Sequence, residues 1–546
     1  MRRYRDLTNL LDLRFKTRTG VALLTDFMPC HDARAGDGPR LHDVPRVIRI
    51  VECLSGRVTL RHVFSPRPAF SQEEPVFEAV DTNLHATTTS IALAVSSTGP
   101  IPGPRSTFTL EAGQSVAFAM YANTRFRATP RGWSVERARD FLRRTQDFWW
   151  RWGAQCRYDG PYRAFVIRSA LVLKLMTYRP TGAIVAAPTT SLPEAIGGPR
   201  NWDYRFTWLR DAAFTLFALF QLGLHNEAHD FFDWLTKRHI GSMGRDLPNL
   251  FDLSGRATVP ERELTHLQGY RRSRPVRVGN AAVNQLQLDV YGEVLDSAYL
   301  YARFGGEISR ALWMELRHVV ELAIKRWEEP DESIWEVRGG RRQFTYSKLM
   351  CWVAVDRGIR LADRYRLPYD TAGWRAARAA MHRRIMAEGY SRRAGAFTQT
   401  LGGETLDAAV LRISQIRFLR DRDPRVLGTI KAVKERLGNG VLVRRYDTST
   451  SRDGLRGGEG AFFMCSFWLA DALAHVGELE EAQRRFEQLV TFSSPLGLYS
   501  EEIDVRTGEL LGNYPQAFTH LALIGAAVNI ERARHRHIGV RGLRSV

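Results

Sequence analysis

The chain has 546 residues, 44% of them hydrophobic, which is enough for two buried cores and is typical of a globular protein. Its net charge at pH 7 is +19, with 78 Lys and Arg residues against 59 Asp and Glu. Because the arginines are spread along the whole length, the charge indicates a solvated basic surface, and we expect no nucleic-acid partner.

Neither a signal peptide nor a membrane span is evident in the sequence. The N-terminus, Met1 to Asp6, is charged, and no uninterrupted apolar run is long enough to cross a bilayer. The five cysteines are scattered and lack metal-ligand spacing. We therefore expect a cytoplasmic protein with reduced, mostly buried thiols, no membrane partner, no cofactor and no metal site.

The first part of the chain, 1–128, has the period-two pattern of antiparallel strands. Ser55 and Gly56, and a Glu-Ala-Gly-Gln run at 111–114, have turn composition. Hairpins are expected from 47–54 with 57–64 and from 106–110 with 115–121. The pattern predicts an N-terminal antiparallel β-sandwich.

A turn cluster at 129–132 ends this pattern. Ser134 is then a good N-cap for a long helix that runs towards Trp152. We interpret 129–157 as a helical linker between two domains.

The remaining residues, 158–540, are nearly all helical in pattern. Residues 206–222 and 461–474 are apolar on almost all sides, whereas 479–490 carries one apolar stripe against a charged face. Twelve such segments predict six α-hairpins closed into an (α/α)6 barrel with inner and outer helices. The expected helices are 160–177, 205–222, 225–238, 280–303, 307–327, 345–366, 371–388, 404–413, 424–437, 460–476, 479–491 and 515–532.

Unequal loops connect these helices, and long loops on a rigid scaffold are where functional residues gather. In such a barrel the loops that enter inner helices converge on one rim. The long loops are expected at 178–204, 239–279, 328–344, 439–459 and 493–514.

The segment 197–211 in the first of these loops combines aromatic and charged side chains. Tyr204 and Trp208 offer flat faces that stack on sugar C–H groups, and Arg210 and Asp211 offer rigid donors and acceptors for hydroxyls. A capped core helix that is merely aromatic is the alternative interpretation.

Two further loops carry carboxylates in unusual settings. Glu336 lies beside Trp335 among apolar residues, where desolvation would raise its pKa as a general acid requires. Glu501 and Glu502 lie in a second acidic cluster, in which some carboxylates stay ionised. Two carboxylates across one rim are the arrangement of an inverting glycosidase. Each cluster alone is equally explained as a helix cap or a solvated turn.

These segments resemble glycoside hydrolase family 15, which contains the glucoamylases and their bacterial glucoamylase-like and trehalase relatives. The similarity covers roughly 8–535. It is carried by GPRNWDYR at 198–205 with Arg210 and Asp211, GNAA at 279–282, QLDVYGE at 287–293, WEVRG at 335–339, GGEGAF at 457–462, SEEID at 500–504 and GNYPQAF at 512–518.

The resemblance implies site roles. Glu336 is expected to be the general acid and Glu501 the general base, with Glu502 as the alternative base. Arg210 and Asp211 are expected to grip the hydroxyls of one glucose, and Tyr204 and Trp208 to wall its subsite. Trp335 is expected at the substrate, and Arg445 on the leaving-group side.

Two departures from the family pattern are visible. Val337 stands where fungal glucoamylases have a second glutamate, so the subsite beyond the cleaved bond should differ. Relatives also have an additional opening segment of the sandwich before the region in which Met1 lies, so we expect either that the start codon was assigned too late or that the first domain is trimmed at its start.

We predict an inverting, exo-acting α-glucoside hydrolase that releases β-glucose from non-reducing ends of α-gluco-oligosaccharides, as glucoamylases do. An α,α-trehalase of the same family is the alternative, and a non-catalytic sugar-binding or polyanion-binding protein is the alternative from another class. The sequence leaves the oligomeric state and any dependence on phosphate or a metal ion open.

Overall fold

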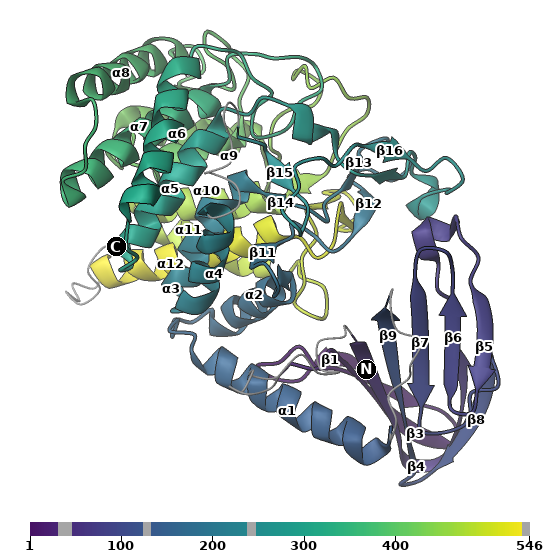
Figure 1. Ribbon diagram of the computed structural model, residues 1–546. Helices are drawn as coiled ribbons and strands as arrows, with labels where there is room; N and C mark the ends of the chain where they lie inside the picture. The colour runs from purple at the N-terminus through teal and green to yellow at the C-terminus, as the bar shows by residue number, and fades with distance from the viewer. Residues whose placement is uncertain (31–45, 124–132, 237–246, 538–546) are drawn as a thin grey trace. The chain divides into compact units, whose positions relative to one another are not determined.

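The computed structural model describes residues 1–30, 46–123, 133–236 and 247–537, and divides into two compact units, Met1–Gln155 and Cys156–Val546 (Figure 1). The turn predicted at 129–132 and residues 239–246 of the long loop at 239–279 lie outside the described residues. The predicted limits of the linker and the barrel stay predictions.

The described part of the first unit contains one bent antiparallel sheet, one α-helix and the short 3-10 helix η2 (Pro68–Ser71). In the sheet, β1 to β4 are followed by β9, β7, β6 and β5, while β8 pairs with the far half of β4. The strands are β1 (Arg2–Tyr4), β2 (Leu11–Lys16), β3 (Gly20–Phe27), β4 (Arg46–Val63), β5 (Val76–Val80), β6 (Asn83–Thr87), β7 (Ala92–Ser97), β8 (Arg105–Glu111) and β9 (Ser115–Asn123).

Both predicted hairpins are wrong, although their strands exist. Residues 47–54 and 57–64 belong to one continuous strand, β4. Gly56 has a φ of +65° next to a register shift between β3 and β4, so the glycine marks a β-bulge and a bend. Strands β8 and β9 both pair with β4, one with each half, and do not pair with each other.

Bending gives the sheet two buried faces. Val51, Val58, Leu84 and Phe118 belong to a core enclosed by the folded sheet. The opposite face packs against α1 (Val135–Ala154), whose N-cap is Ser134 as predicted, because its side chain accepts a hydrogen bond from the Arg137 amide at 3.2 Å.

The second unit is helical. Its helices are α2 (Arg163–Leu175), α3 (Ala212–Gln221), α4 (His225–Leu235), α5 (Asp289–Arg303), α6 (Arg310–Arg326), α7 (Thr345–Tyr365), α8 (Thr371–Arg384), α9 (Pro424–Arg436), α10 (Phe463–Val476), α11 (Leu479–Val490) and α12 (Ala517–His537), with 3-10 helices η3 (Leu209–Asp211), η6 (Ala281–Asn284) and η8 (Ala408–Ile413).

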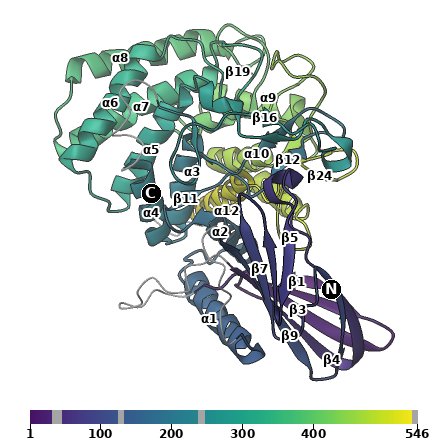
Figure 2. The ribbon, with the colours of Figure 1, turned by 45° about the vertical axis from the view of Figure 1, so that its right-hand side comes forward.

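These helices form the predicted (α/α)6 barrel. Among the described residues, α3, α5, α7, η8, α10 and α12 contact one another in a closed ring, and α4, α6, α8, α9, α11 and α2 each pack on one or two members of it. Figures 1 and 2 show α6, α7 and α8 side by side in both views. Helices α3 and α10 are buried almost throughout, whereas α11 buries only a stripe with Ala482, Phe486, Leu489 and Val490, as predicted.

Three inner segments differ from the predicted helices. Residues 404–413 contain only the short 3-10 helix η8, and α3 begins at Ala212 and not near 205. The predicted helix 280–303 is divided into the 3-10 helix η6 and α5, which begins at Asp289. Residues 201–208 before α3 include two short strands. These strands present the aromatic residues of the segment 197–211 to the barrel rim.

Short strands at the rim of the second unit hold the loops in place. They are β10 (Thr177–Tyr178), β11 (Ala183–Ile184), β12 (Thr190–Pro193), β13 (Asn201–Asp203), β14 (Thr207–Trp208), β15 (Leu250–Phe251), β16 (Arg262–Glu263), β17 (Arg277–Val278), β18 (Tyr390–Ser391), β19 (Ala396–Phe397), β20 (Gly438–Asn439), β21 (Leu442–Val443), β22 (Ala461–Phe462), β23 (Glu502–Ile503) and β24 (Leu510–Leu511).

All five cysteines are free, and all except Cys30 are buried, as predicted. In the described part of the chain, no helix combines the length and the apolar character that a membrane span needs. The cytoplasmic location stays a prediction.

Candidate active site

A small cavity at the N-terminal ends of the inner helices brings seven of the nine predicted site residues together. This active-site cavity has a volume of about 30 Å³. Its lining includes Tyr204, Trp208, Arg210, Trp335, Glu336, Arg445 and Glu501. Asp211 and Glu502 are not among the lining residues.

Glu336 is aimed into the cavity by an unusual backbone conformation. Its φ is +57°, which is rare outside glycine and marks a turn whose conformation the surroundings enforce. One carboxylate oxygen, Oε1, accepts hydrogen bonds from Trp208 Nε1 at 2.6 Å and from Arg210 Nη1 at 2.9 Å. The other oxygen, Oε2, has no hydrogen-bond partner among the described residues, so it is the one available to a ligand.

Glu501 faces the same cavity from the segment before β23. Its side chain is buried, and Oε1 accepts a hydrogen bond from the Tyr204 hydroxyl at 2.8 Å. Oε2 has no partner among the described residues. Burial raises the pKa of Glu501 above the usual range, and the neighbouring carboxylate of Glu194 adds to the rise.

A glycine makes room for this carboxylate. Gly512 has a φ of +74°, and a Cβ there would lie 2.6 Å from Glu501 Oε2. A side chain at 512 would therefore displace the carboxylate.

Glu502 points away from the cavity. It is the first residue of β23, where successive side chains lie on opposite faces, and its Oε2 accepts the Gly460 amide at 2.6 Å. It belongs instead to a buried cluster with Glu194 and Glu459, whose carboxylate oxygens lie within 4.8 Å of one another. Burial and the neighbouring carboxylates raise the pKa of Glu502 well above the usual range.

Two guanidinium groups supply the positive charge of this carboxylate cluster. Arg445 pairs with both oxygens of Glu459, at 2.9 and 2.6 Å, and with Glu194 at 3.3 Å. Arg200 lies 3.3 Å from Glu459 and 2.7 Å from Asp453. Because these fixed cations already face the carboxylates, the cluster is explained as an ion-pair network beside the cavity.

Arg445 also lines the active-site cavity. Its guanidinium lies over the rings of Phe462 and Trp335, with 4.9 and 5.8 Å to the centroids. The indole of Trp335 is held by Asp407, to which it donates at 2.8 Å. Burial raises the pKa of Asp407 to about 6.

Arg210 connects Asp211 to the segment that carries Glu336. Besides Glu336, it donates to the Ile334 carbonyl at 2.7 Å and to Asp211 at 3.1 Å. Asp211 is buried, and this burial raises its pKa to about 6. In this structure Asp211 therefore orients Arg210 and does not itself line the cavity.

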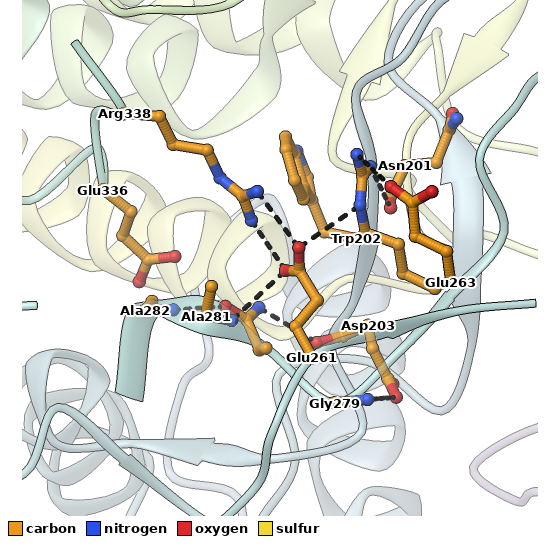
Figure 3. A network of polar contacts seen from close by, with 12 residues as sticks. Asn201, Trp202, Asp203, Glu261, Glu263, Gly279, Ala281, Ala282, Glu336 and Arg338 are labelled. Atoms are coloured by element: carbon orange, nitrogen blue, oxygen red, sulfur yellow. Dashed lines mark hydrogen bonds and ion pairs between the residues drawn. The ribbon is translucent and has the colours of Figure 1, made fainter. Parts of the chain in front are cut away.

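A second cavity of about 30 Å³ shares Tyr204, Trp335, Glu336 and Arg445 with the first. Its far side is formed by a network of polar contacts (Figure 3). Arg338 lies 4.3 Å from the ring centroid of Trp202, and Glu261 pairs with it at 2.6 Å. The two cavities therefore adjoin each other at Glu336.

Sequence reasoning missed some residues around the site. Glu194, fully buried in the cluster, comes from the predicted loop 178–204, but a single glutamate there has no distinguishing signal. Asp407 and Glu261 were also missed. Arg200, Trp202 and Glu459 lie within motifs that the resemblance had already marked, so those motifs could have identified them.

Outside the cavity, His520 is buried, and its Nε2 accepts the Tyr499 amide at 3.3 Å. On α5, Glu293 accepts the Tyr346 hydroxyl at 2.9 Å. Asp289 differs, since neither carboxylate oxygen has a hydrogen-bond partner among the described residues.

A family model described as glycosyl hydrolases family 15 matches residues 160–528. The chain belongs to glycoside hydrolase family 15. It is therefore a glycoside hydrolase, with the barrel and the carboxylate loops predicted from its motifs.

Curated relatives of this family 15 hydrolase carry the name trehalase. The chain is 41% identical over 97% of its length, and 82% of the relative, to a protein of Mycolicibacterium smegmatis named "Trehalase". It is 34% identical over 97% of its length, and 84% of the relative, to one of Thermoplasma volcanium with the same name. These names favour the alternative prediction over the glucoamylase one.

The fold of the whole chain is also found among solved structures. A bacterial glucoamylase complexed with acarbose aligns over 96% of this chain and 82% of that one, with a TM-score of 0.64 and 14% identity. At this identity the likeness concerns the fold alone, and it includes both the N-terminal sheet and the barrel.

Proposed function

We propose that this family 15 hydrolase is an α,α-trehalase that cleaves trehalose by an inverting mechanism. The observation that carries the proposal is the pair of adjoining cavities that meet at Glu336, with Glu501 on one side only. Because the cavities share Glu336, a disaccharide bound there would have one glucose on each side of the cleaved bond. The relatives named trehalase support the same substrate.

Glu336 acts as the general acid in this proposal. Its Oε1 already accepts two N–H donors, so a proton on this carboxyl is carried by Oε2. That oxygen is free to donate to the bridging oxygen of trehalose as the C–O bond breaks. Trp208 and Arg210 fix the carboxyl plane during the transfer.

Glu501 acts as the general base. Its Oε1 is held by Tyr204, which leaves Oε2 to accept a proton from a water molecule on the face opposite the leaving group. The raised pKa of Glu501 makes it a stronger base when it is ionised. The two carboxyls of an inverting enzyme stand about 6.5–9.5 Å apart, which leaves room for this water.

The stereochemistry of the products tests the mechanism. Inversion at one anomeric carbon of trehalose gives one β-glucose from the attacked unit and one α-glucose from the leaving unit. ¹H NMR during the first turnovers should therefore show both anomers in equal amounts. Release of the α anomer alone would contradict inversion.

The substrate is tested by glucose release from trehalose, maltose, isomaltose and soluble starch at equal concentrations. We expect trehalose to give the highest kcat/KM. A higher value for maltose or starch would instead support the glucoamylase prediction, and release from none of them would support a non-catalytic sugar-binding protein.

Matched variants test the two roles. Glu336→Gln and Glu501→Gln should each lower kcat at least a hundredfold while trehalose still binds, since general acid and base catalysis contribute about 10²–10⁴-fold. Glu509→Gln makes the same change in the same loop as Glu501, at an exposed ion pair with Arg271, and should retain the parent activity.

A further inference from the structure

A third, larger cavity lies inside the barrel and shares no lining residue with the active-site cavity. It has a volume of about 150 Å³, and its lining includes Phe214 and Phe217 of inner helix α3. The charged lining residues on α5, α7, α10 and α12 come from the middle or the C-terminal half of each helix. The active-site residues, in contrast, lie at or before the N-terminal ends of the inner helices. Phe214 and Trp468, whose rings stack 5.6 Å apart, form part of its wall.

This cavity, called here the arginine cavity, has a strongly positive lining. Its acidic lining residues are two aspartates, Asp296 and Asp471, and its one histidine is His475. The arginines that line it are Arg303, Arg357, Arg360, Arg412, Arg417 and Arg532. Six cations against two anions give the lining a formal charge of +4 with the histidine neutral. Behind the lining, Asp356 pairs with Arg357 at 2.8 Å and with Arg360 at 2.6 Å.

The aspartates are already engaged. Asp296 pairs with Arg357 at 2.7 Å. Asp471 accepts hydrogen bonds from Asn529 at 2.9 Å and from the amide of Gln415. They therefore do not neutralise the remaining arginines through direct ion pairs.

Three of the arginines form no ion pair with any described residue. Arg412 is buried, bonds to the Gln415 amide oxygen and lies 4.0 Å from the Phe214 centroid, and its Nε has no hydrogen-bond partner. Arg532 bonds only to the amide oxygens of Asn529 and Gln221. Arg417 has neither a hydrogen bond nor an ion pair within the described ranges.

Such a concentration of unpaired guanidinium groups has an energetic cost. A buried charge without a counter-charge is unfavourable, and like charges repel. The pKa of Arg532 is lowered to about 10, mainly by burial and also by the neighbouring Arg303, Arg536 and Arg417, against the opposing effect of Asp471. An anion in the cavity would remove this cost.

Compensation of helix dipoles does not explain the arrangement. That effect acts within the last helical turn. Arg303 is the last residue of α5, but Arg357 precedes the end of α7 by more than two turns, and Arg532 lies more than one turn before the end of α12. Arg412 belongs to the short 3-10 helix η8.

We propose that the arginine cavity binds a small multivalent oxyanion, held by the guanidinium groups of Arg412, Arg417 and Arg532. Arginine presents planar N–H donors that match phosphate and carboxylate oxygens. Arg360 and Arg417 are solvent-exposed, so the cavity can be reached from outside. Because the cavity lies within the ring of inner helices, its ligand is a small molecule and not a polymer.

Calorimetric titration of the full chain tests the proposal. Sodium pyrophosphate, sulfate and citrate are used as probes, with sodium chloride at the same ionic strength as the control. We expect saturable one-to-one binding of at least one multivalent probe. A preference for pyrophosphate or sulfate would identify a phosphoryl-type ligand, and a preference for citrate a polycarboxylate. Absence of saturable binding for all three would overturn the proposal.

The location is tested by two charge-matched variants of α12. Arg532→Gln should weaken binding at least tenfold, and Arg532→Lys less. Arg534→Gln removes the same charge from a residue that pairs with Glu531 and does not line the cavity, and should leave affinity unchanged. Equal weakening by Arg532→Gln and Arg534→Gln would indicate unspecific attraction and contradict the site.

Two further measurements address a folding failure of Arg532→Gln and binding of the probe in the active-site cavity. If Arg532→Gln does not fold, the exposed variant Arg417→Gln should weaken binding several-fold, and unchanged affinity would refute the site. Excess glucose should not displace the probe, because displacement would place the anion in the active-site cavity. The proposal does not depend on trehalase activity, so failure of either leaves the other standing.

Discussion

Removal of the Tyr204 hydroxyl isolates the contact that orients the proposed base. In Tyr204→Phe the carboxylate of Glu501 loses its hydrogen bond of 2.8 Å, while Oε2 already has no partner among the described residues. Hydrogen bonds to charged groups contribute about 1.5–3 kcal/mol. Because this bond favours the ionised form and one pKa unit is worth about 1.36 kcal/mol, its loss should raise the pKa of Glu501 by about one to two units.

The assay is the pH profile of kcat/KM for trehalose. A general base works only when ionised, so the acidic limb of the profile should move to higher pH. On that limb the activity of Tyr204→Phe should fall about ten- to a hundredfold, with partial recovery as the pH rises. An equal loss at every pH would instead indicate displacement of the substrate.

Tyr369→Phe provides the matched control. Its hydroxyl also donates to a carboxylate at 2.8 Å, that of Asp363, but on the exposed surface between α7 and α8. This variant should keep the parent profile. An unshifted acidic limb in Tyr204→Phe, with a folded protein, would refute the role given to the Tyr204 contact.

Three further predictions follow from the structure. Gly512→Ala should lower kcat at least tenfold with little change in KM, because the new Cβ would lie 2.6 Å from Glu501 Oε2; parent-like kcat would show that the carboxylate tolerates displacement. Arg338→Met should raise KM for trehalose several-fold and change kcat less, because Arg338 covers Trp202 beside the second cavity; steady-state kinetics distinguish this from a loss of kcat alone. Burial raises the pKa of Glu293 to about 8. The folded protein therefore keeps this proton at pH values where the unfolded chain has lost it. As a result, Glu293 lowers the free energy of unfolding as the pH rises from about 4.5 to 8. Glu293→Gln should therefore lessen the decline in unfolding free energy over this window by up to about 1.4 kcal/mol per pH unit, measured by urea denaturation, and an unchanged slope would contradict the shift.

The helical barrel could be predicted because helix periodicity is a local signal. Inner segments such as α10 must be apolar on all sides and outer ones such as α11 on one stripe, so the order of the ring is visible in the sequence. The late start of α3 at Ala212 could not be predicted in this way. Helix-compatible residues before it are held as short strands by pairing with distant segments, as in β14 with β15.

The sheet was harder to predict because pairing is non-local. Ser55 and Gly56 have the composition of a hairpin turn, and only the pairing of Gly20 with Gly56 shows that the glycine lies within one long strand, two residues after the register shift at Leu54. The same holds for β8 and β9, which are adjacent in sequence but pair with opposite halves of β4.

The choice between Glu501 and Glu502 shows the same limit at the site. Both glutamates fit the motif, and local composition does not separate them. Pairing of Glu502 with Phe462 in β22, and the bond of its carboxylate to the Gly460 amide, fix which face of β23 each side chain occupies. Since successive side chains of a strand alternate, the residue that enters the carboxylate cluster leaves its neighbour to the cavity. The strand β23 is only two residues long, and its position is fixed by pairing with β22, about 40 residues earlier in the chain. This pairing separates Glu501, the proposed base, from the carboxylate cluster that contains Glu502.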